Sequence, residues 1–223
     1  MRFPVGIDES AASFQSGDKN ISVERFLPKT SKPAPIVIAL HGSGGTDGGG
    51  GAQYGRALAG QGYIVLVAHY FDRTGHTWAA PHEIQPNFET WMETVRDAIT
   101  YALTLPNNNG KVGLLGMSLG AYLALSVAVS DARVHAVVDF FGGLPDVLVP
   151  QVNHMPPVLI LHGEADATVP VAEAHKLKRL FDEKQLPYEM KTYTGAGHAF
   201  HGADMMDAAQ RTLSFLDQHL HSE

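Results

Sequence analysis

The stretch KVGLLGMSLG, residues 111–120, decides how the rest of the chain is interpreted. Its first half is an apolar run typical of a buried strand, and its second half places Ser118 between Gly116 and Gly120. Glycines at these positions leave room for a sharp strand-to-helix turn, which holds the apex residue in a strained conformation above the sheet edge. The following helix adds partial positive charge near the hydroxyl. The pattern therefore predicts that Ser118 is a nucleophile.

Short apolar runs alternate with helical patterns on both sides of this stretch. The runs that predict strands are residues 36–40, 64–68, 112–115, 136–140, 158–161 and 190–193. Most are nearly continuous in apolar, often β-branched residues, which is typical of parallel strands covered on both faces. Helical periodicity is clear at about 87–105, and the helix after Ser118 is apolar nearly all round, which predicts burial. The alternation predicts an α/β fold with a mostly parallel, doubly wound sheet.

The N-terminal part of the chain departs from this alternation. Residues 11–16 and 21–26 flank Gly17–Asp18–Lys19–Asn20, which is a strong turn sequence. We therefore expect an antiparallel hairpin at one edge of the sheet. Neither an internal repeat nor a linker divides the chain, so residues 1–223 are expected to form a single domain.

Composition excludes several classes of function. The formal net charge is −7, which disfavours a nucleic-acid partner, and the chain has no cysteine, which excludes disulfides and zinc–sulfur sites. Neither a membrane-spanning run nor a secretory signal is visible, so we expect a soluble, cytoplasmic protein without a membrane partner, although a trimmed secretion signal would leave no trace. The sequence does not determine the oligomeric state.

A serine nucleophile needs a base and an orienting carboxylate, which in this topology follow it as acid and then histidine. Asp166 lies in the loop after the run at 158–161, and His198 ends a glycine-rich turn after the run at 190–193. These two residues are the predicted acid and base.

Other residues compete for these roles. Glu164 is a second carboxylate in the same loop, and Asp139 lies inside a strand-like run where it could be a hydrogen-bonded core residue. His201 is expected beside the pocket. His162, at a strand end, is expected to have a hydrogen-bonded structural role rather than a catalytic one.

The oxyanion of an acyl-transfer reaction needs two backbone N–H donors. Leu119, the residue after the predicted nucleophile, supplies one. The other is expected from the loop His41–Gly42–Ser43–Gly44–Gly45, with Ser43 as the first choice and Gly44 as the alternative. The glycines continue at residues 48–51, where the run can equally be a flexible connector.

Together these motifs resemble the α/β-hydrolase fold and, within it, the dienelactone hydrolase family. The resemblance runs from about Ile21 to Leu220 and includes H-G-x-G-G at 41–45, G-x-S-x-G at 116–120, "LHGEADATVP" at 161–170 and "GAGHAF" at 195–200. It implies a single hydrolase domain without a large inserted cap, and no cofactor or metal.

The chain also departs from the family pattern. The namesake enzymes use a cysteine where this chain has Ser118, and a glutamate in the loop that here reads His41–Gly42–Ser43. They bind a substrate carboxylate with arginines. Here the stretch after His198 has no arginine, and Arg73 is the one candidate to match. We therefore expect neutral esters or lactones rather than carboxylate-bearing substrates.

These observations predict a serine hydrolase that cleaves small-molecule carboxylic esters or lactones through an acyl-enzyme. Candidate substrate-binding residues are Arg73, Trp78 and His201, and the stretch 75–87 either rims the pocket or packs against the sheet. Two alternatives remain at this point. One is an oligopeptide-cleaving serine peptidase, and the other is a non-catalytic, ligand-binding member of the fold.

Overall fold

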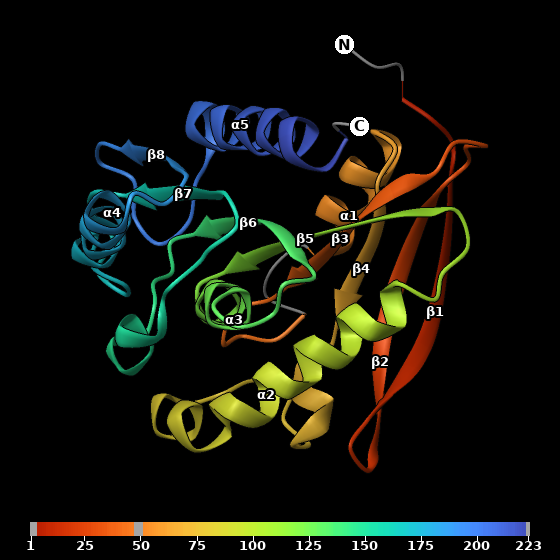
Figure 1. The fold of residues 1–223 in the computed structure, drawn as a ribbon, viewed down its shortest axis with the longest axis horizontal. Helices are drawn as coiled ribbons and strands as arrows, with labels where there is room; N and C mark the ends of the chain where they lie inside the picture. The colour runs from red at the N-terminus through yellow and green to blue at the C-terminus, as the bar shows by residue number, and fades with distance from the viewer. Residues whose placement is uncertain (1–3, 47–50, 222–223) are drawn as a thin grey trace.

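The computed structural model describes residues 4–46 and 51–221, so that Gly48, Gly49 and Gly50 of the glycine-rich run lie outside the described residues. Eight strands form one sheet (Figure 1). They are β1 (Ile7–Ser16), β2 (Lys19–Pro28), β3 (Ala34–Leu40), β4 (Ile64–Ala68), β5 (Asn108–Met117), β6 (Val134–Phe140), β7 (Val158–Gly163) and β8 (Tyr188–Tyr193).

The strand order in the sheet is β1-β2-β4-β3-β5-β6-β7-β8. Strands β3 to β8 pair in parallel, whereas β1 pairs antiparallel with β2 and β2 pairs antiparallel with β4. The predicted mostly parallel sheet with an N-terminal antiparallel hairpin is therefore confirmed. The hairpin turn is tight, because only Gly17 and Asp18 separate the two strands and Gly17 has a φ of 52°.

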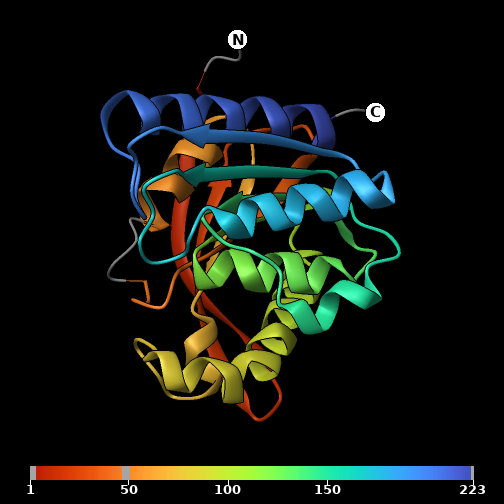
Figure 2. The same ribbon diagram turned by 90° about the vertical axis from the view of Figure 1, so that its left-hand side faces the viewer.

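Helices cover both faces of the sheet (Figure 2). They are α1 (Gly51–Gly60), η1 (Tyr70–Arg73), α2 (Pro81–Ala102), α3 (Leu119–Ala128), η2 (Asp146–Gln151), α4 (Ala172–Lys184) and α5 (Gly202–Leu220). Side chains of α2, α3 and α4 pack in one apolar core with alternate residues of the strands, and those of α1 and α5 pack in a second core on the opposite face. Figure 1 shows α1 and α5 on one side of the sheet and α2 and α3 on the other.

Helix α2 begins earlier than its periodicity suggests. The apolar stripe predicts a start near residue 87, but the helix starts at Pro81 and contains Pro86. Pro81 suits the first helical turn, where its missing N–H costs nothing. In addition, the Glu83 side chain accepts a 2.8 Å hydrogen bond from the Ala80 amide, which stabilises the start. Part of the stretch expected to rim the pocket is therefore helical.

The topology gathers the predicted site residues at one edge of the sheet. Ser118 directly follows β5, Asp166 follows β7, and His198 follows β8. The carboxyl ends of parallel strands meet at the same edge, so loops far apart in the sequence come together there. Within residues 4–46 and 51–221, no helix is both long enough and apolar enough to cross a lipid bilayer.

Candidate active site

Ser118 occupies the turn between β5 and α3 in a strained backbone conformation. Its φ of 53° and ψ of −119° lie in a region that residues with a side chain rarely adopt. The surrounding backbone holds it there, because the Ser118 amide donates a 2.9 Å hydrogen bond to the Phe140 carbonyl and the Ser118 carbonyl accepts from Ala121 and Tyr122. The hydroxyl therefore stands at the start of a helix that is buried almost throughout.

The two glycines around Ser118 are required by close backbone contacts. A Cβ on Gly116 would overlap the Gly120 carbonyl and the Ala121 backbone. A Cβ on Gly120 would overlap the carbonyls of Leu40 and His41. The spacing in the sequence thus reflects the packing of the turn against both its own helix and the end of β3.

His198 joins Ser118 to Asp166. Its Nε2 lies 2.9 Å from the Ser118 Oγ, and its Nδ1 lies 2.7 Å from the Asp166 Oδ2. A carboxylate only accepts hydrogen bonds, so Nδ1 carries the proton and Nε2 is left as the acceptor for the serine hydroxyl. The structure thus brings the three predicted residues into one hydrogen-bonded chain.

The Asp166 carboxylate is fully buried and fully hydrogen-bonded. Its Oδ1 accepts from the amides of Thr168 and Val169, at 2.8 and 2.9 Å. Burial alone would raise the pKa of Asp166, but the hydrogen bonds from His198 and from these amides outweigh it and lower the pKa below its ordinary value. The carboxylate is therefore ionised when His198 is neutral.

His162 supports the loop that carries Asp166. Its Nε2 lies 2.9 Å from the Val169 carbonyl and 3.5 Å from the Asp166 Oδ2. Burial lowers the pKa of this imidazole, so it stays neutral and donates to Val169. The predicted hydrogen-bonded structural placement of His162 is confirmed.

The two rival carboxylates are placed elsewhere. Glu164 is exposed and accepts hydrogen bonds from the hydroxyls of Thr192 and Thr194, at 2.7 and 2.9 Å. Asp139 is completely buried in β6, where its Oδ1 accepts from the Gly142 amide at 2.8 Å. Burial raises the pKa of Asp139 to about 7. Neither carboxylate is hydrogen-bonded to His198 among the interactions of the described residues.

Leu119 and the loop after β3, where the two oxyanion donors are expected, both lie beside Ser118. Leu119 is the first residue of α3, so its N–H has no partner within the helix. The loop after β3 approaches from the other side, since a Cβ on Gly42 would lie 3.3 Å from the Ser118 Cβ. This loop is fixed by a 2.8 Å hydrogen bond from the Ala79 amide to the Ser43 carbonyl.

Two cavities meet at Ser43 and Ser118. The larger one, of about 670 Å³, is called the α2 cavity here and is lined mainly by Ala79, Pro81, Ile84, Phe88, Leu119, Tyr122, Pro145, Val147 and Val169. The smaller one, of about 480 Å³, is called the α5 cavity and is lined mainly by Tyr54, Met117, Phe140, Phe141, His198, Ala199, His201 and Met205. Among the described lining residues of both cavities there is neither a lysine nor an arginine.

The three candidate substrate-binding residues have different positions. His201 lines the α5 cavity, as expected for a residue beside the pocket. Trp78 is 61% exposed and precedes Ala79, which lines the α2 cavity. Arg73 is turned away from both cavities, because its guanidinium packs on the β1–β2 turn at Gly17 and forms a 2.8 Å ion pair with Asp18. This placement does not support a role for Arg73 in substrate binding.

Several cavity residues were not identified from the sequence. Ile84 and Phe88 lie one turn apart on α2; Ile84 falls in the stretch 75–87 that was expected to rim the pocket or pack on the sheet, and Phe88 falls in the helix expected at about 87–105. Phe141 has a φ of 46°, and its ring lies 4.8 Å from the His198 ring. The i, i+4 spacing of the first pair could have indicated a common face. The position of Phe141 depends on a turn that local sequence does not reveal.

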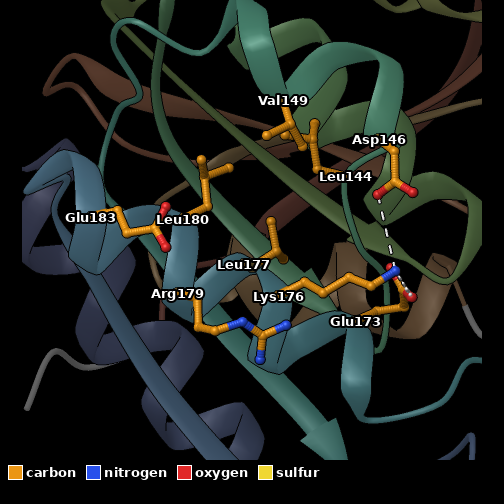
Figure 3. Close-up of a pocket in the computed structure, with 9 residues that line it drawn as sticks. All are labelled: Leu144, Asp146, Val149, Glu173, Lys176, Leu177, Arg179, Leu180 and Glu183. Atoms are coloured by element: carbon orange, nitrogen blue, oxygen red, sulfur yellow. Dashed lines mark hydrogen bonds and ion pairs between the residues drawn. The ribbon is translucent and has the colours of Figure 1, made fainter.

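A separate hollow of about 220 Å³ lies between η2 and α4 (Figure 3). Ser118, Asp166 and His198 are not among its described lining residues. Lys176 at its edge pairs with Glu173 and Asp146, at 2.8 and 4.0 Å. Within the described parts of the chain, no group of three or more histidine, aspartate or glutamate side chains is arranged to hold a metal ion.

A strained serine between a central parallel strand and a buried helix, with a histidine and an acid following in later strand loops, is the arrangement of the α/β-hydrolases. The sheet and its covering helices have the matching architecture. The chain belongs to the dienelactone hydrolase family, whose family model matches residues 22–220. The resemblance noted in the sequence is therefore confirmed.

Comparison with individual proteins agrees with this assignment. The carboxymethylenebutenolidase of Pseudomonas putida is 36% identical over 117 residues, which are 51% of this chain and 48% of that protein. Human acyl-coenzyme A thioesterase 1 is 31% identical over 125 residues, which are 55% of this chain and 27% of that protein. The chain thus spans about half the length, or less, of the curated relatives it matches.

Among solved structures, a dienelactone hydrolase-like promiscuous phosphotriesterase from metagenomic libraries superimposes with a TM-score of 0.83. The two chains are 18% identical, and the match covers 96% of this chain and 99% of the other. Similarity at this level of identity shows the shared fold.

Proposed function

We propose that the protein is a serine hydrolase that cleaves carboxylic esters or lactones through an acyl-enzyme, with Ser118, His198 and Asp166 as its catalytic triad. The observation that carries the proposal is the geometry of His198, whose two ring nitrogens lie 2.9 Å from the Ser118 Oγ and 2.7 Å from the Asp166 Oδ2. Family membership supports the same chemistry.

In the first half of the reaction, the Ser118 Oγ attacks the carbonyl carbon while its proton passes to the His198 Nε2. The carbonyl oxygen becomes an oxyanion, which the amides of Ser43 and Leu119 stabilise. Asp166 stabilises the imidazolium and holds its tautomer. When the oxyanion collapses, the bond to the leaving oxygen breaks and that oxygen takes the proton from Nε2.

In the second half, water takes the place of the alcohol. It gives a proton to the His198 Nε2 as its oxygen attacks the acyl carbon, and a second oxyanion forms between the same two amides. Collapse of this intermediate breaks the bond to Ser118 and returns the proton to Oγ. The products are the carboxylic acid and the free enzyme, and no cofactor takes part in these steps.

The test compares Ser118, in the turn before α3, with Ser126, which lies on α3 itself. Ser118→Ala is expected to abolish both p-nitrophenyl ester hydrolysis and labelling by a fluorophosphonate probe, because triad substitutions cost several orders of magnitude in kcat. Ser126 is buried, with no hydrogen-bond partner for its Oγ among the described residues, so Ser126→Ala is the matched control and should keep both. Retention of more than about a hundredth of wild-type kcat by Ser118→Ala contradicts the proposal.

The same experiment separates the alternatives when the substrates include lactones, aminoacyl anilides and acyl-coenzyme A. A ligand-binding protein without catalysis would not be labelled. Faster cleavage of anilides would favour a peptidase. Acyl-coenzyme A is included because of the similarity to the human thioesterase. The described walls of the two cavities, however, offer no cation for the phosphates of coenzyme A, which favours uncharged esters.

A further inference from the structure

His198 lies on one side of Ser118, and its position distinguishes the two cavities. As the first tetrahedral intermediate collapses to the acyl-enzyme, Nε2 must protonate the leaving oxygen, so the leaving group has to lie within reach of this nitrogen. His198 lines the α5 cavity together with Ala199 and His201, and it is not among the described residues that line the α2 cavity. The alcohol of an ester therefore faces the α5 cavity.

The other directions at the reacting carbon are then determined. A tetrahedral intermediate has four substituents, of which Ser118 is one and the leaving oxygen a second. The oxyanion points to the amides of Ser43 and Leu119. The acyl chain takes the remaining direction, and the second cavity that opens at Ser118 is the α2 cavity. We propose, on the basis of the function proposed above, that the acyl group of the substrate occupies the α2 cavity and that its alcohol occupies the α5 cavity.

The walls of the α2 cavity indicate which acyl groups fit. Ile84, Phe88, Leu119 and Val147 present apolar surface to a volume of about 670 Å³, against about 480 Å³ for the α5 cavity. Val147 is 74% exposed and places apolar surface at this cavity. The substrate class is thus an ester of a medium-chain or aromatic acid with a smaller alcohol.

Charge in the same cavity excludes anionic acyl groups. The charged residue among its described lining residues is Glu89, whose carboxylate pairs with Arg96 at 3.2 Å on the exposed side of α2. A carboxylate on the acyl chain would lose its hydration without gaining a cation from the described lining residues. The neutral, apolar acyl chain gains free energy from burial, at about fourfold in kcat/KM for each methylene removed from water.

One side chain in each cavity allows the assignment to be tested. Ile84 lies on α2 and is half-buried, so that a larger side chain fills the α2 cavity without entering the sheet. Met205 lies on α5 and is also half-buried; its Sδ accepts a 3.5 Å hydrogen bond from the Tyr54 hydroxyl across the α5 cavity. Ile84→Trp and Met205→Trp are therefore matched variants, one for each cavity.

The experiment crosses these variants with two substrate series. The first varies the acyl chain from acetate to octanoate with p-nitrophenol as the constant leaving group, and the second varies the alcohol from methanol to hexanol with acetate as the constant acyl group. Ile84→Trp should lower kcat/KM for octanoate relative to acetate at least tenfold and leave the alcohol series unchanged. Met205→Trp should lower kcat/KM for hexyl acetate relative to methyl acetate. It should leave the ratio of octanoate to acetate unchanged, because every member of the acyl series has the same p-nitrophenol in the α5 cavity. Ile84→Ala, which enlarges the cavity, should shift the preferred acyl chain to greater length.

The outcomes separate this inference from the proposed function. Fluorophosphonate labelling of each variant reports whether Ser118 and His198 remain intact. If the variants are labelled but the two effects are exchanged, or neither series changes in any variant, the assignment of the cavities is wrong while the hydrolase remains. If the wild-type protein is neither labelled nor active on any ester, the proposed function itself fails.

Discussion

Replacing Asp166 by asparagine tests the role of the carboxylate without changing its shape. Oδ1 faces two N–H donors, from Thr168 and Val169, and Oδ2 faces His198. The asparagine oxygen must take the Oδ1 position, because the reverse orientation directs an NH₂ group at two N–H donors. The NH₂ group then faces His198, whose Nδ1 becomes an acceptor and whose Nε2 carries the proton. In that tautomer the imidazole no longer accepts the proton of Ser118.

The size of the effect follows from the cost of the reverse orientation. That orientation leaves two N–H groups unsatisfied, at about 1–3 kcal/mol each, or roughly 2–6 kcal/mol in total. At about 1.4 kcal/mol for each factor of ten, the productive tautomer falls by roughly 30-fold to 10⁴-fold. We expect kcat for Asp166→Asn to fall within this range, while the KM for a p-nitrophenyl ester changes little.

Steady-state kinetics on a p-nitrophenyl ester measures this loss, and Glu164→Gln is the matched control. Glu164 lies in the same loop but is exposed and bonded to the hydroxyls of Thr192 and Thr194, which can reorient. Its substitution should change kcat less than about threefold, as expected for an exposed side chain. The reasoning is refuted if Asp166→Asn keeps more than a tenth of wild-type kcat, or if Glu164→Gln loses as much as Asp166→Asn.

Three further predictions concern the turn, the core and the substrate. Gly120→Ala should lower Tm by roughly 2–12 °C and slow fluorophosphonate labelling, because the added Cβ overlaps two carbonyls. Gly60→Ala is the control and should not lower Tm, because a Cβ there has no atom within 4 Å. Equal melting temperatures of the two variants would contradict the packing argument. Burial raises the pKa of Asp139 to about 7 from 3.8, so the folded state keeps a proton that the unfolded state releases. Wild-type stability should therefore fall relative to Asp139→Asn by up to about 1.4 kcal/mol per pH unit as the pH rises from about 4 to about 7, measured by urea unfolding; a difference that does not depend on pH would disprove it. A neutral ester should have a higher kcat/KM than its carboxylate-bearing analogue, and Arg73→Ala should not alter that ratio because Arg73 is paired with Asp18; a tenfold preference for the anion that Arg73→Ala removes would reverse this conclusion.

The parts of the fold that depend on local pattern could be predicted from the sequence. Continuous apolar runs located the parallel strands, because both faces of such strands are buried. Ser118 could be located because a sharp turn between a strand and a helix needs glycines at both 116 and 120. Asp166 and His198 followed from the order of the loops. The structure brings all three within hydrogen-bond distance.

Features that the apolar periodicity does not encode were not predicted. The start of α2 at Pro81 depends on a hydrogen bond from the Ala80 backbone to Glu83, which the apolar periodicity does not reveal. Arg73 was a candidate for substrate binding because of its residue type, yet the β1–β2 turn provides its partner Asp18. The two cavities are formed by pieces of several elements, and no single stretch of sequence encodes them.

The proposed catalytic residues and the wall of the α2 cavity lie on different elements, which has a consequence for how this protein can evolve. The three residues proposed as the catalytic triad follow the ends of β5, β7 and β8, so their positions depend on the sheet. Much of the wall of the α2 cavity comes from α2 and η2, which lie outside the sheet. Substitutions on such partly exposed surfaces usually change stability by less than about 0.5 kcal/mol. With the acyl group in the α2 cavity, as proposed, single substitutions there can change which substrates fit while the proposed catalytic residues stay unchanged.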